Sequence, residues 1–213
     1  MTFDLRGHGQ SGKPGGPYDV PMFASDLAGL FEALGIQSAH VVGISLGGCV
    51  AFQFALDYPA RVKTLTIVNS APTLGSREQA EKEIDRRVGI VEQFGMRGMG
   101  QALSTNLFPK LEHALLRQTF VERWAENDPV AYVAATRSIL NWDVSDRLHS
   151  IQCPTLIVAA DQDYSPVAVK EAYARLIAHS ELVTIPDAHH AVPLERPQEF
   201  NAVLAQFLAR HSS

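Results

Sequence analysis

What this 213-residue sequence lacks excludes several classes of protein. No stretch approaches the roughly 18 consecutive apolar residues of a membrane-spanning helix. The N-terminus has no basic stretch leading into an apolar segment, so neither a secretory signal nor a transit peptide is visible. Lysines and arginines do not cluster, and the formal net charge is -5, which disfavours a nucleic-acid partner. We therefore expect a cytoplasmic protein that binds neither membranes nor nucleic acids.

Cysteine is also scarce. Cys49 and Cys153 are the two cysteines, and they lie in apolar-looking segments without CxxC spacing or a histidine at metal-ligand distance. A disulfide-stabilised scaffold and a zinc site are therefore both poor interpretations. We predict two reduced, buried thiols and no metal.

The period of the apolar residues predicts an α/β fold. Helical patterns alternate with short apolar runs that are typical of strands, which indicates a mostly parallel sheet with flanking helices. The functional loops of such a sheet lie at the carboxyl ends of its strands. The predicted strands are residues 1–5, 39–43, 62–68 and 155–160, with a weaker one at 181–185, and the predicted helices include 23–34, 50–58 and 197–208.

One long segment interrupts this alternation. Residues 73–147 contain no convincing strand and are predicted as helices, at 78–94, 111–127 and 129–140. We interpret this insertion as a helical cap over the strand ends, which leaves residues 1–72 and 148–213 as the α/β core. The alternative is a second helical layer that takes no part in chemistry.

The motif Gly43-Ile44-Ser45-Leu46-Gly47 lies between a predicted strand and a predicted helix. On such a tight turn the serine hydroxyl is lifted clear of the sheet, and larger residues at the flanking positions are expected to clash. The helix that follows directs its N-terminal amides toward the site, so that the amide of Leu46 can donate to a developing oxyanion. Ser45 is therefore the candidate nucleophile.

A serine nucleophile needs a base, and usually a carboxylate that orients the base. His189 and His190 lie in the loop after the last predicted strand, and one of them is the candidate base. Asp161 and Asp163 follow the strand at 155–160 and are both candidate acids. The chain order is then Ser, Asp, His, which is the order of α/β-hydrolases.

With these motifs, the sequence resembles the α/β-hydrolase superfamily in its branch of small capped esterases and enol-lactonases. The resemblance covers essentially the whole chain and rests on residues 4–11 (DLRGHGQS), 43–47, 154–166 and 185–195. It selects Asp163 as the acid and His190 as the base, with Asp161 in reserve. Ala160 and His189 occupy positions where the family usually has glycine, so His189 stays an alternative base.

The resemblance implies a serine hydrolase of a small carboxylic ester or lactone, acting through an acyl-enzyme without cofactor or metal. A serine at position 45 disfavours the dehalogenase and epoxide hydrolase branches, which use a carboxylate nucleophile. Trp142 and Arg137 are candidates for lining the substrate pocket. The alternatives are a carbon–carbon bond hydrolase or a cofactor-free perhydrolase with the same three residues, or a non-catalytic binding protein or inactive fragment with this fold.

The resemblance also implies that part of the fold is absent. Residues 1–5 correspond to the fourth strand of the family, so about 45 to 60 residues are expected upstream. These include the third strand and the loop that supplies the second oxyanion-hole amide. We therefore expect the chain to be a fragment or to have a misassigned start.

Overall fold

The computed structural model describes residues 1–212. By its internal contacts the chain divides into two compact units. The helical unit comprises residues 1–26 and 74–142, and the sheet unit comprises residues 27–73 and 143 onward. Helix α1 (Val20–Ala33) runs through the boundary between them.

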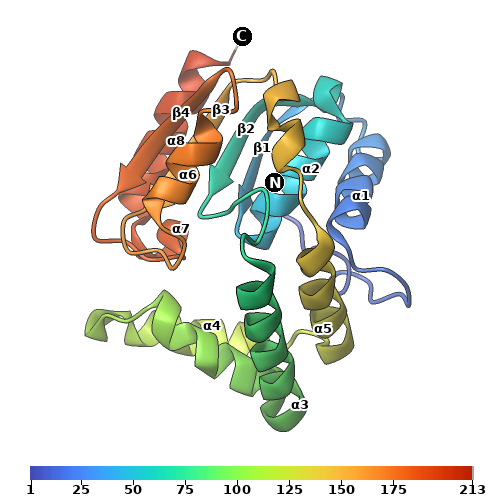
Figure 1. Ribbon diagram of the computed structural model, residues 1–213, viewed down its shortest axis with the longest axis vertical. Coiled ribbons are helices and arrows are strands. Elements are labelled where there is room, and N and C mark those ends of the chain that lie inside the picture. Colours follow the sequence, from blue (N-terminus) through green and yellow to red (C-terminus); the bar gives the residue numbers. More distant parts are fainter. Residues whose placement is uncertain (213) are drawn as a thin grey trace. The chain divides into compact units, whose positions relative to one another are not determined.

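The sheet unit contains one parallel sheet with the strand order β1-β2-β3-β4 (Figure 1). This arrangement confirms the predicted α/β fold class. Because all pairs are parallel, the carboxyl ends of the strands lie at one edge, and the loops after them are neighbours. The strands are β1 (Ala39–Ile44), β2 (Val62–Val68), β3 (Thr155–Ala160) and β4 (Ser180–Ile185).

Helices cover this sheet, and β3 lies at the centre of the core with every residue buried. Figure 1 shows α6 in front of β3 and β4, and α8 behind them. Phe200 and Phe207 of α8 belong to one buried cluster with Leu156 and Val158 of β3. The elements around the sheet are α2 (Leu46–Asp57), η1 (Pro59–Arg61), η4 (Ser145–Ser150), α6 (Val167–Ala174), α7 (Val192–Glu195) and α8 (Pro197–Arg210).

The helical unit has its own small core, made of Val91, Met96, Met99 and Tyr132. Its longest helix bends at Gly95, whose φ of 65° interrupts the helical backbone and favours glycine. The predicted helix at 78–94 ends at this break, and a second helical segment of α3 follows it. The elements are α3 (Arg77–Leu107), η2 (Leu111–His113), α4 (Ala114–Ala125), α5 (Pro129–Ser138) and η3 (Ile139–Asn141).

The N-terminal segment forms turns that pack within the helical unit. Gly7 has a φ of 77°, and a Cβ at this position would lie 2.5 Å from the ring of Tyr18 and 2.6 Å from the side chain of Ala131. The amide of Gly9 donates to Oδ1 of Asn127 at 3.2 Å. The motif DLRGHGQS therefore organises contacts between the N-terminus and the α4–α5 region.

Two predictions about local structure were wrong. Residues 1–5 form no strand and pair with no strand in the described part of the chain. The carbonyls of Asp4 and Leu5 instead accept hydrogen bonds from Ser11 and His8 in the turns that follow. Cys153 is only half-buried, whereas Cys49 is buried, which raises the pKa of its thiol to about 11. Both cysteines are free. The boundaries of the predicted cap, 73 and 147, stay a prediction.

Between residues 1 and 212, no helix is both long and apolar enough to span a membrane. The same residues hold no group of three or more histidine, cysteine and acidic side chains that could bind a metal ion.

Candidate active site

Ser45 occupies the sharp turn between β1 and α2. Its φ of 53° and ψ of -120° lie outside the regions that a non-glycine residue normally adopts, so the turn is strained. The neighbouring glycines show how closely the turn is packed. A Cβ on Gly43 would lie 2.1 Å from the carbonyl oxygen of Gly47, and a Cβ on Gly48 would lie 2.4 Å from the Cβ of Ser70. A Cβ on Gly47 would meet nothing within 4 Å, so the expected clash was wrong for that flanking position, and Gly48 is the second crowded residue.

Hydrogen bonds from β2 hold this turn in place. The Ser45 amide donates to the carbonyl of Val68 at 3.1 Å, and the Ser70 hydroxyl donates to the carbonyl of Ser45 at 2.8 Å. No acceptor within residues 1–212 takes the amide hydrogen of Leu46 at the start of α2. That amide is therefore free to donate to another group, as an oxyanion-hole donor must be.

His190 and Asp163 form the histidine–carboxylate pair of the site. Nδ1 of His190 lies 2.8 Å from Oδ1 of Asp163, and the two side chains are 10% and 0% exposed. Asp163 is placed by the loop after β3 and His190 by the loop after β4. The sequence left two histidines and two aspartates as candidates, and a hydrogen bond in the structure joins His190 to Asp163.

Lys170 binds the other oxygen of the same carboxylate. Its ammonium donates to Oδ2 of Asp163 at 2.6 Å and to the carbonyl of Ser165 at 2.5 Å, and both charged side chains are fully buried. Burial alone would raise the pKa of Asp163, but the hydrogen bonds and charges of His190 and Lys170 lower it overall. Sequence reasoning missed Lys170, because α6 has no strong periodic pattern that marks its single lysine as inward-facing.

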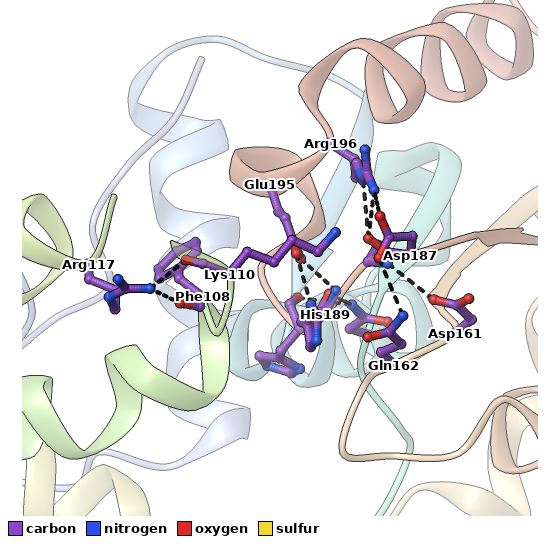
Figure 2. Close-up of polar contacts among 12 residues, drawn as sticks. Phe108, Lys110, Arg117, Asp161, Gln162, Asp187, His189, Glu195 and Arg196 are labelled. Carbon is purple, nitrogen blue, oxygen red and sulfur yellow. Dashed lines mark hydrogen bonds and ion pairs between the residues drawn. The ribbon is translucent and has the colours of Figure 1, made fainter. Parts of the chain in front are cut away.

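The two residues held in reserve have other partners. Nδ1 of His189 lies 2.8 Å from Oε1 of Glu195, whose other oxygen accepts the His189 amide at 2.6 Å (Figure 2). The Glu195 side chain is fully buried. Asp161 accepts the amide of Ala188 at 3.1 Å; partial desolvation opposes the lowering of its pKa, but the backbone hydrogen bonds prevail. Both carboxylates therefore stabilise the histidine loop from outside the His190–Asp163 pair.

Asp187 is the strained residue of this loop, with a φ of 53°. The Arg196 guanidinium donates to the Asp187 carbonyl at 3.0 and 3.1 Å and also to its carboxylate, and the Gln162 amide donates to the carboxylate at 3.4 Å (Figure 2). These contacts join the loops after β3 and β4 at the turn that precedes the histidines.

Asn69 connects three strand ends with a single side chain. It follows β2, is buried, and has a φ of 42°. Its amide nitrogen donates to the carbonyls of His189 and His190 at 3.2 and 2.9 Å, and its oxygen accepts the amide of Ala160 at 2.8 Å. Sequence reasoning missed this residue; the only available signal was a polar residue directly after a buried strand.

Tyr164 lies against the other nitrogen of the histidine. Its hydroxyl is 2.7 Å from Nε2 of His190, and the two rings stack with their centroids 4.2 Å apart. Tyr164 is 65% exposed. Within the described residues, Ser45 and His190 make no hydrogen bond, since Nε2 is engaged by the tyrosine.

The two predicted pocket residues belong to the helical unit. Trp142 is buried and Arg137 is exposed, and their part in a substrate pocket stays a prediction. In the same unit the Arg117 guanidinium donates to the carbonyls of Phe108 and Lys110 at 2.5 and 2.7 Å, which orders the connection before α4 (Figure 2).

A parallel sheet with a strained serine after β1 and a buried histidine–carboxylate pair after β3 and β4 defines the class of α/β-hydrolases. Comparison with known proteins identifies the family. The family model described as the alpha/beta hydrolase fold matches residues 1–197. The chain belongs to this family and is a hydrolase of this fold.

Three relatives illustrate the similarity. The chain is 28% identical to 3-oxoadipate enol-lactonase 2 of Acinetobacter baylyi, over 99% of this chain and 78% of that protein. A thermophilic esterase from Thermogutta terrifontis has a TM-score of 0.90 and 29% identity, covering 99% of this chain and 79% of that one. The enol-lactonase from Burkholderia xenovorans has a TM-score of 0.89 and 25% identity, with 97% and 79% covered.

Proposed function

We propose that the protein hydrolyses a small carboxylic ester or lactone, with Ser45 as nucleophile, His190 as base and Asp163 as the orienting acid. The observation that carries this proposal is the strained backbone of Ser45 at the same sheet edge as the buried His190–Asp163 pair. The similarity to proteins named as enol-lactonases and an esterase supports this substrate class.

In the proposed reaction the Ser45 oxygen attacks the carbonyl carbon while Nε2 of His190 takes its proton. Asp163 accepts the hydrogen bond from Nδ1, which fixes the tautomer that leaves Nε2 free to act as a base. The Leu46 amide donates to the oxyanion of the tetrahedral intermediate. The leaving alkoxide takes the proton from His190, and water then cleaves the acyl-enzyme by the same steps.

The tyrosine beside His190 sets one condition on this mechanism. The Tyr164 hydroxyl occupies Nε2 in the structure, so it must move away before that nitrogen can take a proton from Ser45. Tyr164 is 65% exposed, so a rotation about its side-chain bonds would turn the ring from its stack on His190 toward solvent. The bound substrate is the group that we expect to displace it.

The test measures hydrolysis of p-nitrophenyl acetate and of a small lactone series, together with labelling by a fluorophosphonate. We expect the unmodified protein to turn over at least one substrate and to be labelled once, on Ser45. Ser45→Ala should abolish labelling and lower kcat by at least about a thousandfold, since the nucleophile is lost. Ser150→Ala, which changes an exposed serine of the same unit, is the matched control.

Either of two results would overturn the proposal. One is turnover that survives in Ser45→Ala at the level of the Ser150→Ala control. The other is an unmodified, folded protein that neither reacts with the fluorophosphonate nor hydrolyses any ester or lactone of the panel.

A further inference from the structure

The fully buried ammonium of Lys170 is a charge that the proposed reaction does not use. Lysine side chains almost never become fully buried unless they are paired, because removing the charge from water is costly. Here Nζ lies 2.6 Å from Oδ2 of Asp163, and the exposed fractions of both side chains are 0%. The pair lies one hydrogen bond from His190.

We infer that Lys170 is a positioning residue that sets the proton affinity of His190 through the carboxylate of Asp163. This inference rests on the proposed function, in which His190 must be unprotonated to accept the proton of Ser45. It gives a role to a side chain that touches neither the nucleophile nor the base.

Two hydrogen bonds fix the orientation of the Asp163 carboxylate. Asp163 has two oxygens, and each accepts one charge-assisted or ring N–H donor: Oδ1 faces Nδ1 of His190 at 2.8 Å, and Oδ2 faces Lys170. Nζ of Lys170 is fixed in turn by the carbonyl of Ser165 at 2.5 Å. The carboxylate plane therefore cannot rotate without losing one of these bonds, and Oδ1 stays aimed at the imidazole.

The charge of Lys170 also changes the electrostatic environment of His190. An isolated buried carboxylate beside an imidazole favours the imidazolium strongly, because charge interactions are weakly screened in the interior. The ammonium of Lys170 neutralises Asp163, so the pair as a whole attracts a proton to His190 less than a lone carboxylate would. Lys170 thereby keeps the base unprotonated at lower pH, and it keeps Asp163 ionised in a site whose burial favours the neutral acid.

The other titratable groups around the pair leave this charge balance intact. Tyr173 of α6 and Cys49 of α2 are buried, which raises the pKa of both, so they are neutral near pH 7. Tyr164 reaches His190 through its hydroxyl. In the adjoining loops, Glu195 is engaged by His189 and Asp161 by a backbone amide. Among the ion pairs of the described residues, Asp163 takes part in two, with Lys170 and with His190.

Two substitutions test the inference. Lys170→Met removes both the charge and the donor, and Lys170→Gln removes the charge but keeps an N–H donor. In both variants we expect the acid limb of the kcat/KM profile to move to higher pH by about one unit, because His190 beside an unneutralised carboxylate holds its proton to higher pH. At pH 6 kcat/KM should then be about tenfold lower, with recovery toward pH 9.

The control is Lys63→Met, which removes an exposed lysine of the same sheet and should leave the profile unchanged. A purely structural role predicts a different result. In that case kcat/KM of both Lys170 variants falls by the same factor at every pH, or does not change, and the midpoint of the acid limb stays that of the control. This result would overturn the inference.

A titration without substrate separates this inference from the proposed function. The ring signals of His190, assigned with His190→Gln, are followed by NMR in histidine-labelled protein, and the midpoint should rise in Lys170→Gln. An unmodified protein without esterase activity refutes the proposed function, yet this midpoint still decides the role of Lys170. If neither variant folds, the ¹⁵N signal of the Lys170 side chain in the unmodified protein decides: an ammonium at pH 7 supports the inference, and a neutral amine overturns it.

Discussion

Ion pairs differ in their exposure to solvent between the edge of the sheet that carries the candidate site and helix α3. At the sheet edge, Asp163 and Lys170 pair with no exposure at all. On α3, Glu78 pairs with Lys82 one helical turn away, and these side chains are 77% and 73% exposed. Both pairs have a nitrogen–oxygen distance of 2.6 Å. Distance therefore does not distinguish them; the solvent around each pair decides what breaking it costs.

Removing the carboxylate of the buried pair should have the largest effect. Asp163→Asn leaves Lys170 without a counter-charge and lets the amide favour the wrong tautomer of His190. We expect kcat to fall by about 10³- to 10⁴-fold and the free energy of unfolding to fall by about 3–5 kcal/mol. Initial rates and urea denaturation measure the two effects. Asp161→Asn, in the same loop, should keep kcat within a few-fold, and equal losses in both variants would refute the assignment of Asp163.

Glu195 is the next test, because it is buried but lies outside the proposed catalytic residues. Glu195→Gln keeps its shape and loses the charge that accepts both the amide and the ring of His189. We expect a loss of about 1–3 kcal/mol in the free energy of unfolding, as for a buried hydrogen-bonding group that loses a partner. The exposed Glu199→Gln should change it by less than about 0.5 kcal/mol. Thermal and urea unfolding of the two variants make the comparison, and equal stabilities would show that burial is irrelevant here.

The smallest effect is expected on α3. The pKa of Glu83 is lowered to about 2. The hydrogen bond from Arg86 is the largest cause, Arg87 lowers the pKa further, and desolvation opposes both. Because the folded-state pKa is below the ordinary value of 4.5, the stabilisation is present above pH 4.5 and is lost as the pH falls toward 2. The pairs are 28–45% exposed, so solvent screens them.

We accordingly expect Glu83→Gln to cost less than about 1 kcal/mol at pH 7, with a smaller cost in 1 M salt. Urea denaturation at pH 7 and pH 2.5, at low and high salt, is the measurement. A loss at pH 7 as large as that of Asp163→Asn would contradict the contrast between exposed and buried pairs.

The sequence predicted the parts of the fold that have a strong local pattern. The four strands of the sheet were predicted within a residue or two of their ends, because each is a short apolar run bounded by polar or turn residues. The strand at residues 1–5 was wrong because strand formation depends on a pairing partner, which a local pattern does not reveal. In the helical unit, the predicted end of the first long helix at residue 94 agrees with the break in the helical backbone at Gly95, because glycine is a local signal that the sequence displays.

The residues of the candidate site also differ in whether a local sequence pattern marks them or only the fold brings them together. Ser45 was predicted from the local spacing of its motif, whereas the residues alone left two acids and two histidines open, and the resemblance to the family selected Asp163 and His190. Lys170 and Asn69 were not predicted, because their roles depend on burial and on partners 7 to 121 residues away, which only the fold brings together. The choice between His189 and His190 is of the same kind, since adjacent histidines differ only in the carboxylate that each one meets.

The Asn69 side chain has one more consequence. It binds the main-chain carbonyls of both histidines as well as the amide of Ala160, so one side-chain amide holds both the loop of the proposed base and the end of the strand that precedes the proposed acid. A displacement of β2 relative to β3 would therefore reach the proposed base and acid together. If the proposed function holds, the alignment of His190 with Asp163 depends on the rigidity of the sheet, and we expect substitutions deep in its strands to alter the reaction without changing a reacting group.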